Sequence, residues 1–234
     1  MKGYDDKLGE AEDRSAFELA LELAEDKKAE VVMATDPDCD RMAPAVRDKE
    51  GNYQFLNGNE TGVLFADYLL RTKKEAGNLS DNGAIIKSIV STDMVSEIAA
   101  EYGVEVLDVL TGFKFIGEKI TEYEASGEKD FILGFEESLG YLIGKHARDK
   151  DAVIATMLIA EMAAYYQTKN ISLYEKLQSL YEKHGYYKSD LKAIRKPGKE
   201  GQAEIEAMLA DLRENSPRCG RARRARVQIG RAHV

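Results

Sequence analysis

The run Ala84-Ile-Ile-Lys-Ser-Ile-Val90 predicts a buried β-strand, and Val104-Glu-Val-Leu-Asp-Val-Leu110 predicts a second one. Between them a helical pattern covers residues 92–102 and ends at Gly103. Two strands joined through a helix form a crossover unit in which the strands lie parallel. A helical pattern over 115–123, a strand over 131–135 and an apolar helix over 152–167 continue the alternation. The sequence therefore predicts an α/β fold with a parallel, helix-covered sheet.

The segment before this alternation has a different pattern. A helix beginning near Phe17 leads to a short apolar strand over 31–34, and extended segments over 43–47 and 53–56 flank a polar turn typical of a hairpin. A helix through Leu64 and Leu69 then opens the alternating region. We place a domain boundary near Asn57 and expect mixed-to-parallel sheet domains covered by helices. Residues 1–57 are assigned to one domain, residues 58–170 to a second, and residues 171–217 to a linker and an incomplete third.

Three aspartates alternate in the run Asp36-Pro-Asp-Cys-Asp-Arg41, which follows the strand over 31–34. Carboxylates this close repel one another unless a cation lies among them, and Arg41 supplies a single fixed charge. A divalent metal ion is the natural complement, and an oxygen-only ligand set favours Mg²⁺, Mn²⁺ or Ca²⁺. An EF-hand is excluded, because the sixth and twelfth positions hold Arg41 and Arg47 instead of Gly and Glu. An acidic surface turn is the alternative interpretation.

Polar residues also follow two predicted strands of the second domain. Thr111-Gly-Phe-Lys114 offers a hydroxyl, a cation and a glycine that permits close backbone approach, although a simple strand-to-helix turn explains it equally well. Gly134-Phe-Glu-Glu-Ser-Leu-Gly140 places two carboxylates and a hydroxyl at a strand end, which suits the vicinal hydroxyls of a sugar. A helix N-terminus is the alternative there. The charged run Arg148-Asp-Lys-Asp151 either binds phosphate or starts the next helix.

Composition limits the classes of function. The 234 residues are 44% hydrophobic, which suits a globular protein, and the sequence contains neither an apolar run of membrane-spanning length nor a recognisable signal peptide. With two cysteines, a reducing cytoplasmic location is the expectation. The last 17 residues hold six of the 33 basic groups and none of the 42 acidic ones, so the remainder carries a balance of −15. A body this acidic is not built to bind nucleic acid.

The basic tail has two interpretations. It resembles a nucleic-acid-binding arm in composition. Its ending, Ile229-Gly-Arg-Ala-His-Val234, is however what one reading frame of a common sequencing adapter would encode. We therefore interpret residues 218–234 as a translation artefact on a truncated gene.

Four motifs of this sequence, in their order and spacing, resemble those of the α-D-phosphohexomutase superfamily. They are the aspartate run, the Thr-Gly-Phe-Lys run, the Glu-Glu-Ser run and the Arg-Asp-Lys-Asp run. The similarity covers roughly residues 15–214 and is closest to bacterial phosphoglucomutases. Members have four domains around a central cleft. The resemblance makes residues 1–57 part of the second domain, residues 58–170 the third, and residues 171–217 a linker and the start of the fourth.

The resemblance also implies site roles. Asp36, Asp38 and Asp40 match Mg²⁺ ligands, and Arg41 matches an arginine beside a catalytic phosphoserine. The residues that match the substrate loops are Thr111, Gly112, Lys114, Glu136, Ser138 and Lys150. The implied activity interconverts glucose 1-phosphate and glucose 6-phosphate through the phosphoserine and a glucose 1,6-bisphosphate intermediate. Phosphomannomutase and phosphopentomutase activities are alternatives, and a non-catalytic sugar-phosphate or metal-binding module is an alternative of another class.

Two departures from the family pattern affect these expectations. The sequence contains no serine in a Thr-Ala-Ser-His-Asn-Pro type of loop and no phosphate-binding loop of the fourth domain. We therefore expect a fragment that lacks its N- and C-terminal domains, acts on no substrate alone and meets a small sugar phosphate only in the complete protein. Cys39 occupies a position that is usually Gly or Ala, and we expect it to be tolerated.

Overall fold

The computed structural model describes residues 17–188 and 198–215. The chain divides into two units, residues 1–187 and residues 188–234, which are treated separately. In the second unit, the described element is helix α7 (Gly198–Glu214). The first unit contains both sheets and every residue of the loops predicted to form a site. The N-terminal 16 residues and the basic tail over 218–234 lie outside the described residues.

The first sheet consists of β1 (Val31–Thr35), β2 (Met42–Arg47) and β3 (Tyr53–Phe55), in that order, with antiparallel pairing throughout. Helix α1 (Glu18–Lys27) packs beside β1. The aspartate run follows β1, as predicted, and joins it to its antiparallel neighbour β2. The hairpin predicted over 43–56 is confirmed as β2 and β3.

The second sheet has four strands in the order β5-β4-β6-β7. Strands β4 (Gly83–Ser88), β5 (Glu105–Val109) and β6 (Asp130–Phe135) are parallel, as predicted. Strand β7 (Tyr141–Ile143) pairs antiparallel with β6 and was not predicted. Because β4 is central and the chain passes from it to both sides, the loops after β4, β5 and β6 gather at one edge of the sheet.

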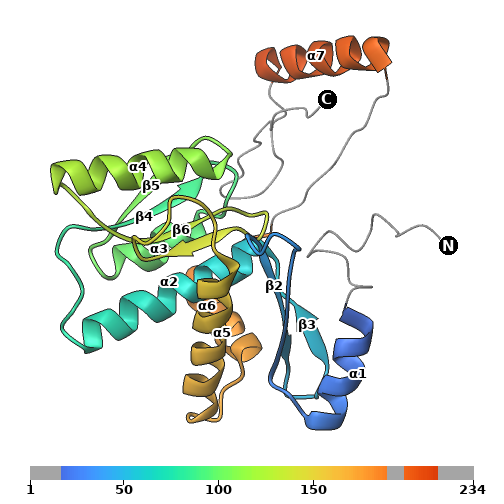
Figure 1. Cartoon of the computed structure of the whole chain (residues 1–234), viewed down its shortest axis with the longest axis vertical. Helices are drawn as coiled ribbons and strands as arrows, with labels where there is room; N and C mark the ends of the chain where they lie inside the picture. The colour runs from blue at the N-terminus through green and yellow to red at the C-terminus, as the bar shows by residue number, and fades with distance from the viewer. Residues whose placement is uncertain (1–16, 189–197, 216–234) are drawn as a thin grey trace. The chain divides into compact units, whose positions relative to one another are not determined.

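Helices cover both faces of this second sheet (Figure 1). Helix α4 (Phe113–Ser126) packs on β4 and β6, while α2 (Gly58–Glu75) and α3 (Met94–Ala100) cover the other face. The opposite faces follow from right-handed crossovers that leave β4 toward β5 and then return past it to β6. Adjacent residues of β4 show the alternation, because Ile85 belongs to the large core and Ile86 to a smaller core under α4.

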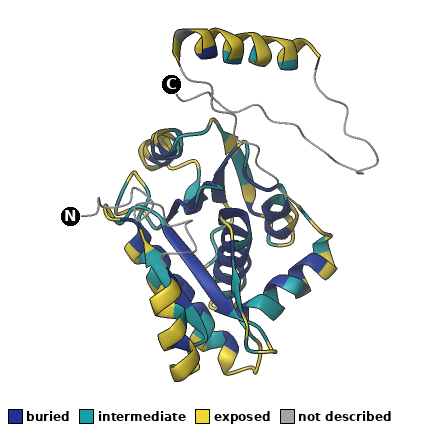
Figure 2. Ribbon diagram, turned by 90° about the vertical axis from the view of Figure 1, so that its right-hand side faces the viewer, coloured by how far each residue is buried: buried dark blue, intermediate teal, exposed yellow. Residues whose placement is uncertain are grey.

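The large hydrophobic core is continuous across the boundary predicted at Asn57. It joins Met42 and Val46 of the first sheet to Phe65 of α2 and to Tyr141 of β7. In Figure 2 the buried residues, in dark blue, are concentrated on the inner helices and strands of the unit. Asn57 caps α2 in a reciprocal capping box with Glu60. The two predicted domains are thus packed against each other through apolar side chains, which fixes the loops of each relative to the other.

Helices α5 (Ala152–Gln167) and α6 (Leu173–His184) complete this unit. Asp151 caps α5, as its carboxylate accepts hydrogen bonds from the backbone N–H groups of Val153 and Ile154. Helix α6 packs on α2, α3, α5 and β2, and buries Leu173, Leu177 and Leu180. The division that we placed at residue 170 stays a prediction, and α6 itself lies within the compact first unit.

Candidate functional site

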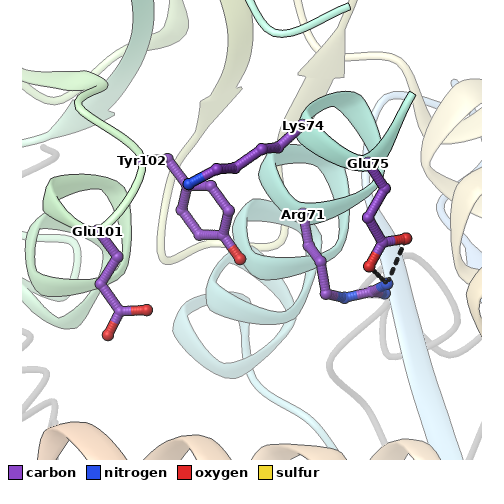
Figure 3. A pocket seen from close by; sticks show the side chains of 5 residues that line it. All are labelled: Arg71, Lys74, Glu75, Glu101 and Tyr102. Carbon is purple, nitrogen blue, oxygen red and sulfur yellow. Dashed lines mark hydrogen bonds and ion pairs between the residues drawn. The ribbon is translucent and has the colours of Figure 1, made fainter. Parts of the chain in front are cut away.

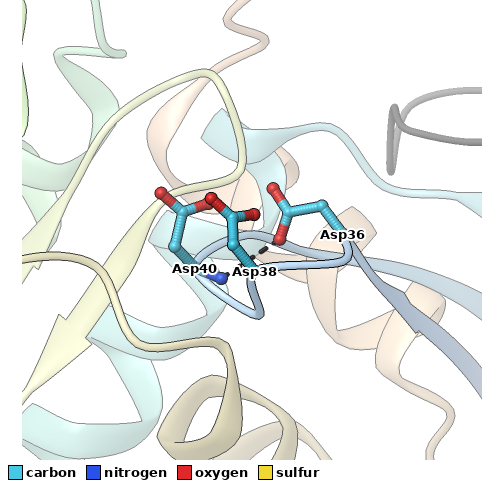
Figure 4. Close-up of side chains that lie close together, drawn as sticks. All are labelled: Asp36, Asp38 and Asp40. Atoms are coloured by element: carbon cyan, nitrogen blue, oxygen red, sulfur yellow. Dashed lines mark hydrogen bonds between the residues drawn. The ribbon is translucent and has the colours of Figure 1, made fainter. Parts of the chain in front are cut away.

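The aspartate loop over residues 36–41 is a tight turn between β1 and β2. The backbone N–H of Cys39 donates to the carbonyl of Asp36 at 3.0 Å, and Cys39 has a φ of 58°, in the left-handed region. This backbone turns three alternate side chains to one side, as Figure 4 shows. One carboxylate oxygen from each of Asp36, Asp38 and Asp40 lies within 4.8 Å of the others. A Gly would adopt this φ without strain, which gives a physical reason for the small residue expected at position 39.

Asp36 is the rigid member of the three. Its side chain is buried, and its Oδ1 accepts the backbone N–H groups of Asp40 at 3.1 Å and Arg41 at 3.0 Å. Its Oδ2 accepts Nε of Arg41 at 3.0 Å. Burial alone would raise the pKa of Asp36, but these hydrogen bonds and the Arg41 charge hold it below the usual range. Asp36 is therefore an ionised anchor that orients the loop.

Asp40 meets a cation from the other half of the unit. Its Oδ2 lies 2.8 Å from Nζ of Lys150, and its Oδ1 lies 3.5 Å from Nε of Arg41. That Oδ1 is buried and accepts no hydrogen bond within the described part of the chain. Burial alone would lower the pKa of Lys150, but the carboxylates of Asp40 and Asp149 raise it, so the ammonium stays charged.

Asp36, Asp38 and Asp40 together fit a hard divalent cation. Their ligand atoms are all oxygens, they converge within 4.8 Å, and a buried carboxylate oxygen of Asp40 has no donor of its own. An anionic oxygen left without a donor is costly unless a cation completes it. Asp38 is exposed, so it leaves one side of the cluster open to a ligand from solvent. The loop therefore has the donor set of an Mg²⁺ or Mn²⁺ site.

A second loop, residues 136–140, lies beside the first. It joins β6 to β7 as a tight hairpin in which the N–H of Glu136 donates to the carbonyl of Gly140 at 2.9 Å. We had considered a helix N-terminus here, and the structure shows a hairpin instead. Arg41 and Gly140 form an isolated antiparallel bridge, and the N–H of Met42 donates to the carbonyl of Leu139 at 3.2 Å. The aspartate loop and the hairpin are thus hydrogen-bonded through their backbones.

Glu136 joins this hairpin to the loop after β5. Its Oε1 accepts the backbone N–H of Gly112 at 2.7 Å, and Gly112 has a φ of 116° that favours glycine. Glu136 is 7% exposed. Burial raises the pKa of Glu136 most, the neighbouring Glu137 charge adds to the increase, and the Gly112 hydrogen bond partly opposes it. The carboxylate keeps one oxygen, Oε2, that this hydrogen bond does not use.

Glu137 has a supporting position that the sequence did not reveal. Its Oε2 accepts the hydroxyl of Ser88 at 2.8 Å, and the hydroxyl of Ser91 lies 3.5 Å from the same oxygen. Gly58 packs so closely beneath that a Cβ there would lie 2.1 Å from the carbonyl oxygen of Glu137. The signal for this support was Ser88 near the end of the predicted strand over 84–90 and Ser91 directly after it. The loop after β4 therefore holds the base of the hairpin.

The other predicted substrate residues lie at the same sheet edge with fewer fixed contacts. Thr111 and Ser138 are half-buried at the loop after β5 and at the hairpin tip. Lys114 is exposed in the first turn of α4, and its Nζ lies 4.8 Å over the ring of Phe115. The structure thus brings Asp36, Asp38, Asp40, Arg41 and Lys150 into one cluster and Gly112 and Glu136 into an adjoining pair. Lys114 belongs to neither group.

A shallow pocket of about 370 Å³ lies elsewhere, between α2 and the end of α3 (Figure 3). It is lined by Arg71, Lys74, Glu75, Glu101 and Tyr102. Tyr102 comes shortly before β5, so the pocket lies toward the amino ends of the parallel strands, away from the loops described above. Arg71 bonds Glu75 and the hydroxyls of Tyr165 and Tyr166. These pairings make the pocket wall part of the α2–α5 packing.

Residues 57–184 match a family model described as phosphoglucomutase/phosphomannomutase, alpha/beta/alpha domain III. The match covers more than half of the chain. The chain belongs to the phosphoglucomutase/phosphomannomutase family. Membership confirms the superfamily to which the four sequence motifs pointed, and it accounts for the three-layer arrangement of α4, the second sheet and α2 with α3.

Relatives within this family extend the similarity beyond the matched domain. A phosphoglucomutase of Staphylococcus haemolyticus is 35% identical over 211 residues, which are 90% of this chain and 37% of that protein. A human protein named glucose 1,6-bisphosphate synthase is 40% identical over 179 residues, which are 75% of this chain and 29% of that protein. The chain thus spans about a third of the length of these relatives.

A solved structure from Thermus thermophilus, assigned as a phosphomannomutase, has the same fold. It superposes with a TM-score of 0.59 and 21% identity, and covers 76% of this chain and 36% of that one. The α/β architecture predicted from the sequence is therefore confirmed for this family member. Among the described residues, none of the helices has the length and apolar character needed to cross a membrane.

Proposed function

We propose that this chain forms the metal-binding and sugar-binding part of a phosphoglucomutase that interconverts glucose 1-phosphate and glucose 6-phosphate. The observation that carries the proposal is the junction of the two loops, where Arg41 bridges to Gly140 and Lys150 bonds Asp40. A metal site and a sugar site must be adjacent for phosphoryl transfer, because the ion would neutralise charge on the phosphoryl group as the group reaches the sugar hydroxyl. The similarity to a staphylococcal phosphoglucomutase supports the same activity.

Asp36, Asp38 and Asp40 would hold Mg²⁺, for which their oxygen-only donor set is suited. When bound, the ion supplies positive charge that stabilises the phosphoryl group during transfer. Arg41, fixed on Asp36, would contribute a guanidinium charge to the same group. The hard cation, the arginine and the lysine together make the electropositive environment that phosphoryl transfer requires.

The loops at the edge of the second sheet would bind the sugar phosphate. Glu136, held by the N–H of Gly112, has a free carboxylate oxygen for sugar hydroxyls, and Ser138 offers a hydroxyl at the hairpin tip. Thr111 and Gly112 would line the same site, and Lys114 and Lys150 would meet phosphate. Because Glu136 is buried and held by the Gly112 hydrogen bond, it would determine which end of the sugar faces the metal.

The nucleophile is assigned to a part of the complete protein that this sequence does not contain. A phosphoserine there would donate its phosphoryl group to the sugar monophosphate, giving glucose 1,6-bisphosphate, and would recover a phosphoryl group from the other end. Residues 1–57 would belong to the metal-loop domain, residues 58–170 to the sugar-binding domain, and residues 171–217 to a linker and the following domain. A cytoplasmic location, without nucleic-acid partners, completes the proposal.

A second candidate is the synthesis of glucose 1,6-bisphosphate itself. The human relative with that activity in its name is 40% identical over three quarters of this chain. The same loops would serve both reactions, since each transfers a phosphoryl group to a bound sugar monophosphate. Phosphomannomutase and phosphopentomutase activities differ only in the sugar accepted, and specificity of that kind depends on hydroxyl contacts of a whole cleft.

The test uses the complete protein, obtained by recovering the gene on both sides of this reading frame. Purified from a host without its own mutase, it is assayed with Mg²⁺ and glucose 1,6-bisphosphate on glucose 1-phosphate, mannose 1-phosphate and ribose 1-phosphate. We expect the fastest turnover with glucose 1-phosphate and loss of at least about a hundredfold in Asp38→Asn. Lys145→Met serves as the control, because Lys145 pairs with Asp130 outside the site. Turnover of none of the three sugars would contradict the proposed activity.

A further inference from the structure

Contacts from three parts of the fold hold the side chain of Lys150 against the aspartate loop. Its Nζ lies 2.8 Å from Oδ2 of Asp40, and the side chain is 17% exposed. Its stem crosses Gly140 so closely that a Cβ at that glycine would lie 2.4 Å from Cδ of Lys150. The ring of Phe113, at the start of α4, lies 5.6 Å from Nζ. The ammonium is therefore guided onto Asp40 from the hairpin side.

The charges of this cluster show what the ammonium does there. Three carboxylates converge within 4.8 Å, and the guanidinium of Arg41 is already bonded to Asp36. Lys150 thus forms the shorter of two ion pairs to Asp40, because Nε of Arg41 lies 3.5 Å from its Oδ1. Nζ of Lys150 also lies 3.0 Å from Oδ1 of Asp149. The Asp40 carboxylate is one of the three oxygen donors that a divalent ion would need, so the ammonium and the ion would lie close together if both used it. Two cations at that separation repel each other strongly in a half-buried site.

We propose that Lys150 is an internal counter-cation of the aspartate loop, and that its ammonium and a divalent metal ion exclude each other at Asp40. Binding of the ion displaces Lys150 from Asp40 and leaves its ammonium paired with the exposed Asp149 alone, on the hairpin side where the proposed sugar phosphate binds. The inference rests on the metal site of the proposed function. It makes the ion and an anionic ligand cooperative, since each favours the state in which Lys150 has left Asp40.

The experiment measures Mn²⁺ binding to the present chain by electron paramagnetic resonance of the free ion, with circular dichroism to confirm folding. Lys150→Met is compared with wild type and with Lys145→Met, which removes the same charge from the Asp130 pair. We expect Lys150→Met to bind Mn²⁺ at least about threefold more tightly than Lys145→Met. Lys150→Gln should change the affinity in the same direction, and it replaces the Met variant if that one does not fold.

The outcomes separate the inference from the metal site. Equal or weaker binding in both Lys150 variants, with binding in wild type that Asp38→Asn abolishes, would overturn the inference and leave the metal site intact. Mn²⁺ binding to the Lys150 variants, without binding to wild type, would support the inference most strongly, because Lys150 would then exclude the ion completely. Absence of binding from every variant would overturn the metal site and the inference together.

Discussion

The backbone N–H of Gly112 donates a 2.7 Å hydrogen bond to Oε1 of Glu136, which ties the loop after β5 to the hairpin after β6. Both loops follow parallel strands of one sheet, so they meet at its carboxyl edge. The bond satisfies one oxygen of a buried carboxylate and fixes the direction of the other. Glu136 therefore has a defined orientation before any ligand binds, which is what a sugar-reading residue needs.

Replacing Glu136 by Gln should make the stability of the chain less dependent on pH. Burial first, and then the Glu137 charge, raise the pKa of Glu136 in the folded state. A carboxyl with a raised folded pKa stabilises the fold at low pH, and this contribution is lost as pH rises through that pKa. Glu136→Gln keeps the acceptor for Gly112 without the charge. We expect a thermal midpoint a few degrees above wild type at pH 7 and a smaller difference near pH 4.

Differential scanning calorimetry at both pH values measures this effect, with Glu118→Gln on the exposed side of α4 as the control. The control should change the midpoint little at either pH. A Glu136→Gln midpoint below wild type at pH 7 would show that the ionised carboxylate stabilises the fold.

The support beneath the hairpin gives a second prediction. Ser88 is fully buried and donates to Glu137 at 2.8 Å, so Ser88→Ala leaves the Glu137 carboxylate without its shortest hydrogen bond. We expect a loss of about 1–2 kcal/mol in the free energy of unfolding, measured by urea denaturation. Ser179→Ala on the exposed face of α6 should stay within about 0.5 kcal/mol of wild type. Equal effects of the two substitutions would mean that Ser88 does not hold the hairpin.

The backbone conformation of Cys39 leads to a third prediction. Its φ of 58° strains any side chain with a Cβ and strains a β-branched one most. The free energy of unfolding of Cys39→Val should therefore be about 1–2 kcal/mol lower than that of Cys39→Gly, although Val has the larger apolar side chain. Chemical denaturation of both variants tests this difference. A Val variant as stable as the Gly variant would show that packing, and not backbone conformation, governs the position.

Local patterns were enough to predict the most apolar elements. The helix expected over 152–167 has those bounds in the structure, since Asp151 caps it and the apolar run that follows is too long for a strand. The strand over 131–135 is likewise present, starting one residue earlier at Asp130. Strand β7 was missed because the loop before it was interpreted as a binding loop or a helix N-terminus, whereas the equally short β3 follows a polar turn that is typical of a hairpin.

Contacts between segments far apart in the sequence were beyond such patterns. The motifs identified Asp40 and Lys150 as separate candidates, but their 2.8 Å contact depends on the packing of two sheets through a shared core. The serines that hold Glu137 were passed over for the same reason, because residues 88 and 137 meet only through the parallel pairing of β4 with β6. Resemblance assigned roles to residues, while the structure showed which of them touch.

The central claim is that Asp36, Asp38 and Asp40 form a divalent metal site. Crystals of this chain soaked in Mn²⁺ and measured at the manganese absorption edge test it directly, because the anomalous signal locates the ion. We predict a peak bonded to carboxylate oxygens of all three aspartates, and its loss in Asp38→Asn crystals. A Mn²⁺-soaked wild-type crystal with no peak at this loop, or with peaks only elsewhere, would contradict the account.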